Sequence, residues 1–397
     1  MHYCVKNYVS ENDKYSTSIK NINKKFTKII TMKKIYYTIG FIFVSSIGFT
    51  NTLDFEPIES KTQSIIIQII PKLELFHIMA YLSNSSHLNN FEFKYKSEID
   101  SFFEPFRNQN AVLFVNKVLH NYHSHLLING LFVNNNFKKD SSCVNFLNVN
   151  DFGLEDSYSN KVLILDSLTK TIDSFAKTAN FNKFIDSHET YYKQKISEVK
   201  DAISNVEIKK YNETFWGSQK DNYQFVICLL EQDIHSYWFD YENKLYSVFF
   251  LSPKFIVDND AKFGNANQSN LKEGKMSAQD YIFYGAAHEL GHGFLNPIVD
   301  KYKVEIDKIN FMVSTSDPSK SIFLCESMLR SLTAYFMIEN NYADVAQMVL
   351  QMEKQNGYIY NDLILELIKD YSVNRAIYKN FNDYMPILIT KLNQQIK

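Results

Sequence analysis

Two histidines and a glutamate near residue 290 have the types and the spacing of a metal site. The segment His288-Glu289-Leu290-Gly291-His292 matches the pattern H-E-x-x-H. In a helix, residues four apart lie on one face, so both imidazoles can reach one tetrahedral Zn²⁺ at about 2.0–2.1 Å. Glu289 falls at the edge of that face, within reach of a water in the fourth metal position. Because the metal lowers the pKa of this water towards about 7, Glu289 can accept its proton as a general base.

The residues around the motif predict the helix that this chemistry requires. A capping box at Ser277-Ala278-Gln279-Asp280 can open it, and Pro297 is expected to end it at Asn296. At about 100° per residue, one stripe of this helix is apolar, and both histidines fall away from it. The stripe consists of Ile282, Ala286, Leu290 and Phe294. Gly285 shares the histidine face and would leave room above the metal. The alternative is a pair of histidines at the edge of the core beside a solvated glutamate.

A third protein ligand has to come from outside the motif. We favour Glu326, 34 residues after His292, in a helix that Asp317-Pro318 would open. Its neighbours are apolar, and a carboxylate among them needs a partner such as a metal. An intrahelical pair with Arg330 is the alternative, and both contacts can hold at once. Weaker candidates lie in a polar stretch that we expect to be solvated: Asp300, Glu305 and Asp307.

The other histidines are expected to serve the structure. A cluster at His120, His123 and His125 has no carboxylate or cysteine beside it, so we expect a helix surface. His188 and His235 stand singly near aromatic residues and are expected to pack or to form hydrogen bonds. The four cysteines form no C-x-x-C pair and no disulfide framework. The sequence also has no G-x-S-x-G, P-loop or G-x-G-x-x-G, so nothing supports a serine nucleophile or a nucleotide site.

The hydrophobic pattern predicts an α+β fold that is mostly helical. Residues 64–70 form a strand pattern, and helical periodicity runs through much of 72–200, notably in 111–131 and 163–200. Two runs rich in aromatic and β-branched residues, 223–230 and 244–251, predict a small antiparallel sheet with a polar turn at 240–243. The helix of the motif, a glutamate helix and C-terminal helices follow this sheet.

The first fifty residues differ in charge from the rest of the chain. They hold eight lysines against two acidic residues, and without them the formal charge changes from −2 to −8. Met32-Lys33-Lys34 and the apolar run 35–49 are typical of a secretory signal, so we expect translation to start at Met32 and the product to be secreted or periplasmic. A membrane anchor formed by this segment is the alternative. The acidic remainder argues against a nucleic-acid partner.

A longer string of residues resembles known families. His288, His292 and Glu326 together resemble the gluzincins, zinc peptidases with two helix histidines and a glutamate from a later helix. The string HELGHGFLNP at 288–297, followed by ESMLR at 326–330, is similar to a secreted bacterial family known as domain of unknown function 4932. This resemblance covers about 170–340 and includes 181–192 and the turn at 215–217. The metzincin extension is absent, because Leu295 and Ile298 occupy its glycine and histidine positions.

The charge and hydrophobic patterns divide the chain into an extension with the signal at 1–52 and a mainly helical region at 53–200, and the resemblance implies that the region at 201–397 is zincin-like and catalytic. Gluzincins often carry an acid four residues after the ligand glutamate, to orient a zinc-bound histidine, but Arg330 stands here. The expected function is hydrolysis of a peptide or protein substrate by metal-activated water. The strand 246–251 would pair with the substrate at the sheet edge, and Tyr281 is a candidate oxyanion donor. The alternatives are a binding or structural protein with a non-catalytic zinc, and a zinc hydrolase of non-peptide amides or esters.

Overall fold

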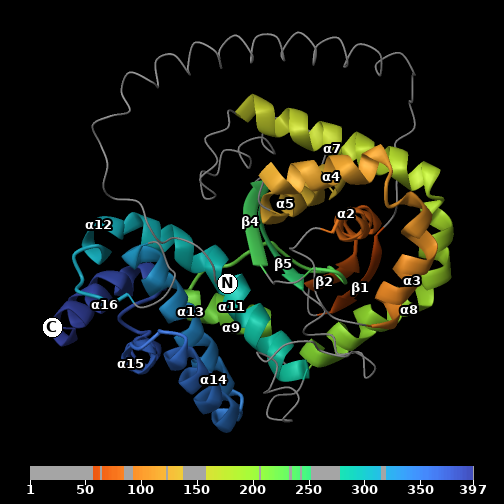
Figure 1. The fold of residues 1–397 in the computed structure, drawn as a ribbon. Helices are drawn as coiled ribbons and strands as arrows, with labels where there is room; N and C mark the ends of the chain where they lie inside the picture. The colour runs from red at the N-terminus through yellow and green to blue at the C-terminus, as the bar shows by residue number, and fades with distance from the viewer. Residues whose placement is uncertain are drawn as a thin grey trace, which may run out of the picture. The chain divides into compact units, whose positions relative to one another are not determined.

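A five-stranded mixed sheet carries the fold, in the order β1-β2-β3-β5-β4 (Figure 1). The three inner strands are β2 (Ile65–Ile69), β3 (Asn222–Ile227) and β5 (Lys244–Leu251), and they run parallel to one another. The outer strands are β1 (Ile58–Thr62) and β4 (His235–Tyr241), and each is antiparallel to its neighbour. The computed structural model describes residues 57–62, 65–84, 93–121, 124–136, 158–204, 207–231, 235–241, 244–251, 278–313 and 319–396. The expected signal segment, Ser277, Asp317 and Pro318 lie outside these residues.

The prediction of an antiparallel sheet is wrong for the centre of the sheet. Parallel neighbours need a long crossover, and residues 70–221, which are largely helical, connect β2 to β3. Strand β4, which the sequence analysis does not predict, pairs Tyr241 with Lys244 and so returns directly into β5. Because β4 takes the outer position, β5 lies beside β3 and parallel to it. The strand 246–251 is therefore an inner strand and not the substrate-pairing edge that we expected.

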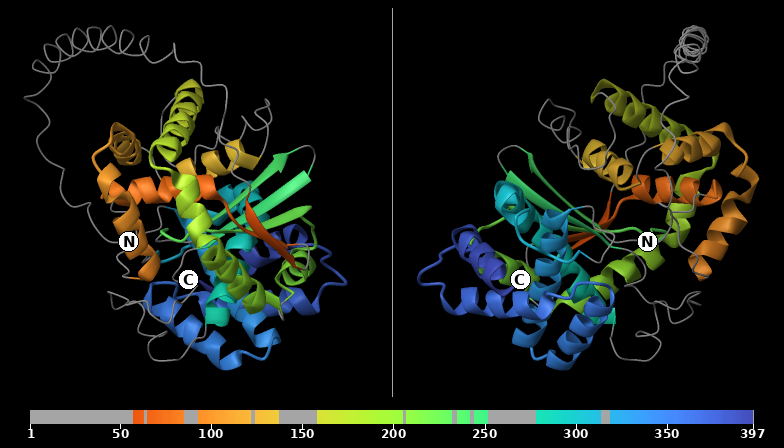
Figure 2. Two further views of the ribbon diagram at one scale, coloured as in Figure 1. Left: turned by 90° about the vertical axis from the view of Figure 1, so that its right-hand side faces the viewer. Right: turned by 60° about the vertical axis from the view of Figure 1, so that its left-hand side comes forward.

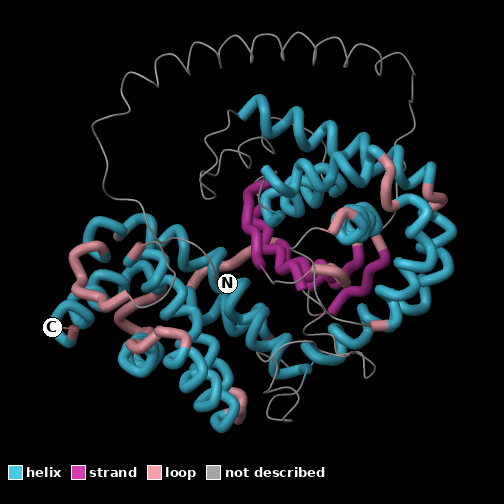
Figure 3. The backbone as a smooth tube through the Cα atoms, in the orientation of Figure 1, coloured by secondary structure: helices cyan, strands magenta, loops and turns pink. Residues whose placement is uncertain are grey.

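The inner strands are buried on both faces, as expected of parallel strands covered on both sides. Ile65, Ile67 and Ile69 of β2 have no exposed surface, and Phe225 and Val226 of β3 are equally buried. Helices lie on either side of the sheet: most of those before α9 (Ile208–Trp216) on one side, and α9 with those from α11 (Ala278–Lys301) onward on the other (Figures 2 and 3).

The helices of the first half surround one buried helix, α2 (Pro71–Leu82), all but one of whose residues are buried. Around it lie α3 (Lys94–Phe103), the 3-10 turn η1 (Glu104–Phe106), α4 (Asn110–Asn121), α5 (Ser124–Asn136), α7 (Tyr158–Thr178) and α8 (Phe181–Ser204). The expected helical content of 111–131 and 163–200 is confirmed in the residues that the structure describes. The second stretch contains a break at Asn180, whose φ of 51° is left-handed and interrupts the helix.

The helices of the second half bring the candidate site together. They are α9 (Ile208–Trp216), α11, α12 (Lys303–Ile306), α13 (Lys320–Glu339), α14 (Ala343–Gln355), α15 (Asn361–Val373) and α16 (Phe381–Gln395). Helix α11 packs along α13 and also contacts β4 and β5, whereas α13 packs against α14 and α15. Among the described helices, α13 alone is long and apolar enough to cross a membrane, and 72% of its apolar stretch is buried in the protein. Burial of this kind is typical of a core helix.

The ends of the two site helices differ from the prediction. Pro297 does not end α11, which continues to Lys301 with the proline inside it. A proline removes one backbone N–H and its ring crowds the carbonyl four residues earlier, which here belongs to Gly293. The turn of α11 after Pro297 buries Val299 in the core. Helix α13 begins at Lys320, where the Ser319 side chain accepts a hydrogen bond from Ile322 N at 3.2 Å.

Candidate metal centre

Helix α11 divides into an apolar face and a polar face, as its sequence predicts. The exposed fractions of Ile282, Ala286, Leu290 and Phe294 are 5% or less, which places that stripe in the core. The opposite side carries the motif, and one ligand atom from each of His288, Glu289 and His292 lies within 4.8 Å of the other two. The two imidazole rings stand nearly perpendicular, 5.0 Å apart. Three groups able to bind one cation therefore converge at this place.

Glu326 of α13 faces both histidines. Its Oε2 lies 3.4 Å from Nε2 of His288, and its Oε1 lies 3.4 Å from Nε2 of His292. Charge-assisted N–H···O hydrogen bonds are shorter, about 2.7–2.9 Å. Two ligand atoms held at about 2.0–2.1 Å by a tetrahedral ion are about 3.3–3.4 Å apart. The observed separations thus fit the ligand shell of a tetrahedral ion better than a set of direct ion pairs.

The charge around Glu326 keeps it ionised. Burial alone would raise the pKa of this carboxyl. The contacts of the carboxyl with His288 and His292, together with the charge of Arg330, outweigh burial and hold its pKa well below its ordinary value. An ionised carboxylate with two neighbouring imidazoles is a donor set suited to a divalent cation. Its formal charge of −1 leaves a bound dication net positive.

A chain of polar contacts connects Glu326 to α14. Arg330 donates from Nη2 to Oε2 of Glu326 at 2.8 Å and from Nη1 to Oε1 of Glu353 at 3.0 Å. Tyr284, one turn before His288, donates a hydrogen bond to the same Glu353 oxygen. Burial and the Glu353 charge raise the pKa of Tyr284 well above its usual value. Sequence analysis missed Glu353, because no local signal relates a glutamate of α14 to a motif some sixty residues earlier.

His292 has a second group of contacts on its other ring nitrogen. Its Nδ1 lies 3.1 Å from Oδ1 of Asn296, one turn later in α11. The thiol of Cys325 in α13 donates to the same Asn296 oxygen at 3.0 Å, and its sulfur lies 3.8 Å from the imidazole Nδ1. Neither residue was singled out from the sequence, although the i, i+4 spacing of His292 and Asn296 is a signal that could have identified the contact.

A glycine lets α11 and α13 approach closely at the motif. A Cβ atom added to Gly291 would lie 2.5 Å from Cδ2 of Leu329, which is fully buried. Leu329 follows Glu326 by three residues and so lies on the same side of α13. The absence of a side chain at position 291 therefore helps to bring Glu326 to the two histidines.

The weaker ligand candidates lie away from this centre. The side chains of Asp300, Glu305 and Asp307 are exposed, as the polarity of their segment predicts. The described side chains do not include Tyr281, so its suggested role lies outside them. Gly285, expected on the histidine face, is buried.

A model of a protein family, described as a domain of unknown function (DUF4932), matches residues 65–391. The chain belongs to the DUF4932 family. The match extends well beyond the expected 170–340 and includes the first-half helices and most of the C-terminal ones. No curated protein and no solved structure matches the chain. The function of this DUF4932 protein is therefore inferred from the residues of the site itself.

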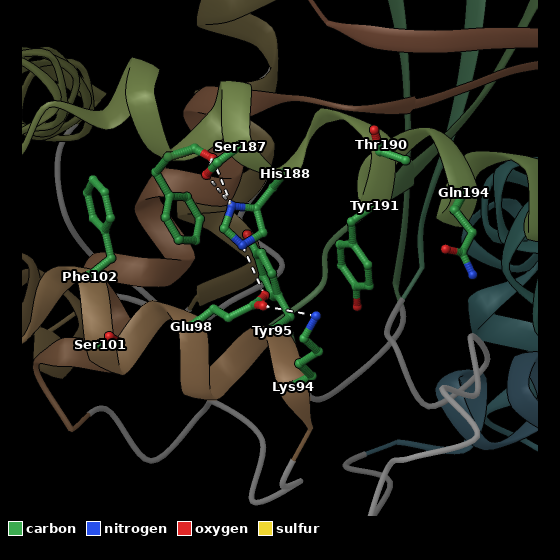
Figure 4. Close-up of a pocket in the computed structure, with 11 residues that line it drawn as sticks. Lys94, Tyr95, Glu98, Ser101, Phe102, Ser187, His188, Thr190, Tyr191 and Gln194 are labelled. Carbon is green, nitrogen blue, oxygen red and sulfur yellow. Dashed lines mark hydrogen bonds and ion pairs between the residues drawn. The ribbon is translucent and has the colours of Figure 1, made fainter.

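Two of the other histidines of the DUF4932 protein, His188 and His235, pack against aromatic rings, as expected. A cavity of about 640 Å³ lies between α3 and α8 and contains His188 (Figure 4). The ring contacts the Phe184 carbonyl oxygen through Nδ1 at 2.8 Å and Glu98 through Nε2 at 3.1 Å. His235 stacks on Phe250. His120 is exposed at the end of α4, and the side chains of His123 and His125 lie outside the described residues.

Proposed function

We propose that this DUF4932 protein is a zinc-dependent peptidase. His288, His292 and Glu326 would hold the metal, and Glu289 would act as the general base. The observation that carries the proposal is the 3.4 Å separation between each Nε2 atom and a Glu326 oxygen. Two separate helices, α11 and α13, supply these atoms, and the distances between them match those between ligands of a tetrahedral ion.

The donor set favours zinc over the other common cations. Two neutral imidazoles and one carboxylate are typical of catalytic zinc sites with three protein ligands. Calcium and magnesium prefer shells made entirely of oxygen atoms, which two histidines cannot provide. When bound, zinc would supply a water of lowered pKa and a Lewis acid for the carbonyl of the scissile bond.

Glu289 is suited to hold and transfer the proton of that reaction. It neighbours His288 in sequence but is turned about 100° around the helix, so its carboxylate is placed beside the ligand face. Its exposed fraction is 9%, so water has little access to the group that must keep the proton. Glu289 would accept a proton from the attacking water and pass it to the leaving amine.

The sheet offers a surface for an extended peptide. No described strand pairs with the outer side of β4. Helix α11 contacts both β4 and its neighbour β5. Trp238 of β4 lies against Gly293 of α11, with 3.4 Å between its Cβ and the position of an added Cβ. A peptide pairing with β4 through backbone hydrogen bonds would lie along the strand next to the motif helix. Secretion through the segment at 32–50 stays a prediction and accords with an extracellular or periplasmic substrate.

The experiment is metal analysis of the purified protein, expressed from Met32. We expect about one zinc per chain, with loss of tight binding in His288→Ala and His292→Ala. His120→Ala is the matched control, because it removes an exposed imidazole outside the site and should keep the zinc. Peptidase activity is then measured as new amino termini released from a mixture of unfolded proteins, with and without chelator. Full zinc occupancy in both motif variants would contradict the metal site, and bound zinc without chelator-sensitive cleavage would point to a structural zinc or a non-peptide substrate.

A further inference from the structure

We propose that Asn296 is a positioning residue that fixes the tautomer of His292, and this inference rests on the proposed metal site. The Oδ1 atom of Asn296 lies 3.1 Å from Nδ1 of His292. The other ring nitrogen of His292, Nε2, faces Glu326 at 3.4 Å. One imidazole thus has an amide on one side and the metal centre on the other.

The chemistry of a neutral imidazole makes these two contacts interdependent. One ring nitrogen carries the proton and the other carries the lone pair, and only the lone pair binds a metal. An acceptor at Nδ1 places the proton there and leaves the lone pair on Nε2, directed at the site. Metal-binding histidines generally donate their second N–H to such an acceptor, and loss of the acceptor commonly costs about 10–100-fold in metal affinity.

The orientation of the Asn296 amide determines which tautomer is favoured. With the amide turned over, its NH₂ group would donate to Nδ1, and the imidazole proton would move to Nε2, where it would block the metal. Cys325 favours the productive orientation, because its thiol donates to Oδ1 at 3.0 Å. Cys325 is buried and immediately precedes Glu326 in α13, so the amide bridges the two helices that carry the ligands.

The rest of the site offers no equivalent support. Nδ1 of His288 is buried and has no hydrogen-bond partner among the described residues. Position 330, four residues after Glu326, holds an arginine, which cannot accept a hydrogen bond from a histidine. Asn296, one turn later in the same helix, is therefore the residue that accepts the hydrogen bond of His292 and orients its ring.

The experiment measures zinc affinity by competition with a chromophoric chelator. Asn296→Leu removes the acceptor and should weaken zinc binding by about 10–100-fold. Asn296→Asp keeps an acceptor and cannot turn a donor towards Nδ1, so it should bind zinc at least as tightly as the wild type. Cys325→Ser retains a donor and should stay close to the wild type, whereas Cys325→Ala should show a smaller loss than Asn296→Leu. Asn340→Leu is the control. It also removes an asparagine hydrogen bond to the preceding turn, from Nδ2 to the Phe336 carbonyl, but it lies at the far end of α13 from the site.

A second measurement needs no metal. Two-bond ¹H–¹⁵N spectra of the imidazoles in the metal-free protein, recorded in mildly alkaline buffer, should show the His292 proton on Nδ1. In Asn296→Leu the same spectra should show a mixture of tautomers. Wild-type zinc affinity in Asn296→Leu, or equal losses in the Asp and Leu variants, would overturn the inference. A wild-type protein that has the Nδ1 tautomer but does not bind zinc would instead contradict the proposed function.

Discussion

Arg330 donates a hydrogen bond to Glu326 across one turn of α13, with 2.8 Å between Nη2 and Oε2. The same carboxylate lies 3.4 Å from both motif histidines. The ion pair with Arg330 is therefore compatible with the proposed role of Glu326 as a metal ligand. Because Arg330 also binds Glu353, whose side chain is only 3% exposed, one guanidinium compensates two acidic groups at the edge of the site.

Arg330→Met should destabilise the metal-free protein strongly. The variant leaves the charges of Glu353 and Glu326 without their cation, and breaking one side of a buried pair costs about 3–5 kcal/mol. Urea unfolding in the presence of chelator measures the change. Lys354→Met is the control, because it breaks an exposed pair with Asp362 and should cost less than about 1 kcal/mol. We expect Arg330→Met to keep zinc and Glu326→Gln to lose it. The reverse result would mean that the third ligand is a group other than Glu326.

Two glycines of the motif helix should respond differently to the same substitution. Gly291→Ala places a methyl group 2.5 Å from Leu329, so it should cost about 1–3 kcal/mol of stability and weaken zinc binding by displacing α13. In Gly293→Ala the new Cβ meets Trp238 at 3.4 Å, an ordinary contact. The gain in helix propensity should then leave this variant unchanged or up to about 1 kcal/mol more stable. Equal stabilities and zinc affinities for the two variants would show that zinc binding does not depend on the close approach of α11 and α13.

Glu74 in α2 should make stability fall as pH rises above the ordinary carboxyl range. Burial raises the pKa of this carboxyl, although the His77 charge and the Tyr95 hydrogen bond act in the opposite direction. Between about pH 4.3, the unperturbed value, and the raised folded pKa, the unfolded chain releases a proton that the folded chain keeps. Stability is therefore lost with increasing pH in that window. Urea unfolding of the metal-free protein in steps from pH 4.5 to 7.5 should show a weaker decline for Glu74→Gln than for the wild type. Parallel curves for the two proteins would contradict this assignment.

Local patterns were sufficient to predict the motif helix and most of the secondary structure. The stripe from Ile282 to Phe294 identified the buried face of α11, because helical periodicity is a property of consecutive residues. The Ile-rich stretch 64–70 likewise predicted β2. The chain path between strands was not predictable in this way. Pairing of β2 with β3 depends on residues more than 150 positions apart, and β4 forms the sheet edge because β5 pairs with β3 on its other side.

The site shows the same division between local and distant information. Spacing within one helix predicted His288, Glu289 and His292, and the apolar neighbours of Glu326 indicated that it needed a partner. The groups that hold these residues come from other elements. Glu353 lies in α14 and has no sequence neighbour that marks its role, whereas Cys325 immediately precedes Glu326 in α13 but contacts Asn296 of α11. Asn296 was the exception, because it lies one turn from His292 and its contact could have been inferred from spacing.

The remaining prediction separates catalysis from metal binding at Glu289. The proposed mechanism places this carboxylate on the attacking water, so Glu289→Gln should retain about one zinc per chain. It should lower the rate of peptide hydrolysis by about 10²–10⁴-fold, the usual cost of losing a general base, and by more if the residue also delivers the proton to the leaving amine.

Glu305→Gln is the matched control for that experiment, because it makes the same chemical change at an exposed position of α12. It should keep both zinc and activity. The decisive comparison is zinc content against initial rate for the wild type and both variants at one pH. Loss of zinc in Glu289→Gln would make Glu289 a ligand, which its position beside the other ligand atoms also permits. Full activity in zinc-loaded Glu289→Gln would mean that another group takes the proton, and the mechanism proposed for this site would then be wrong although the metal site itself would stand.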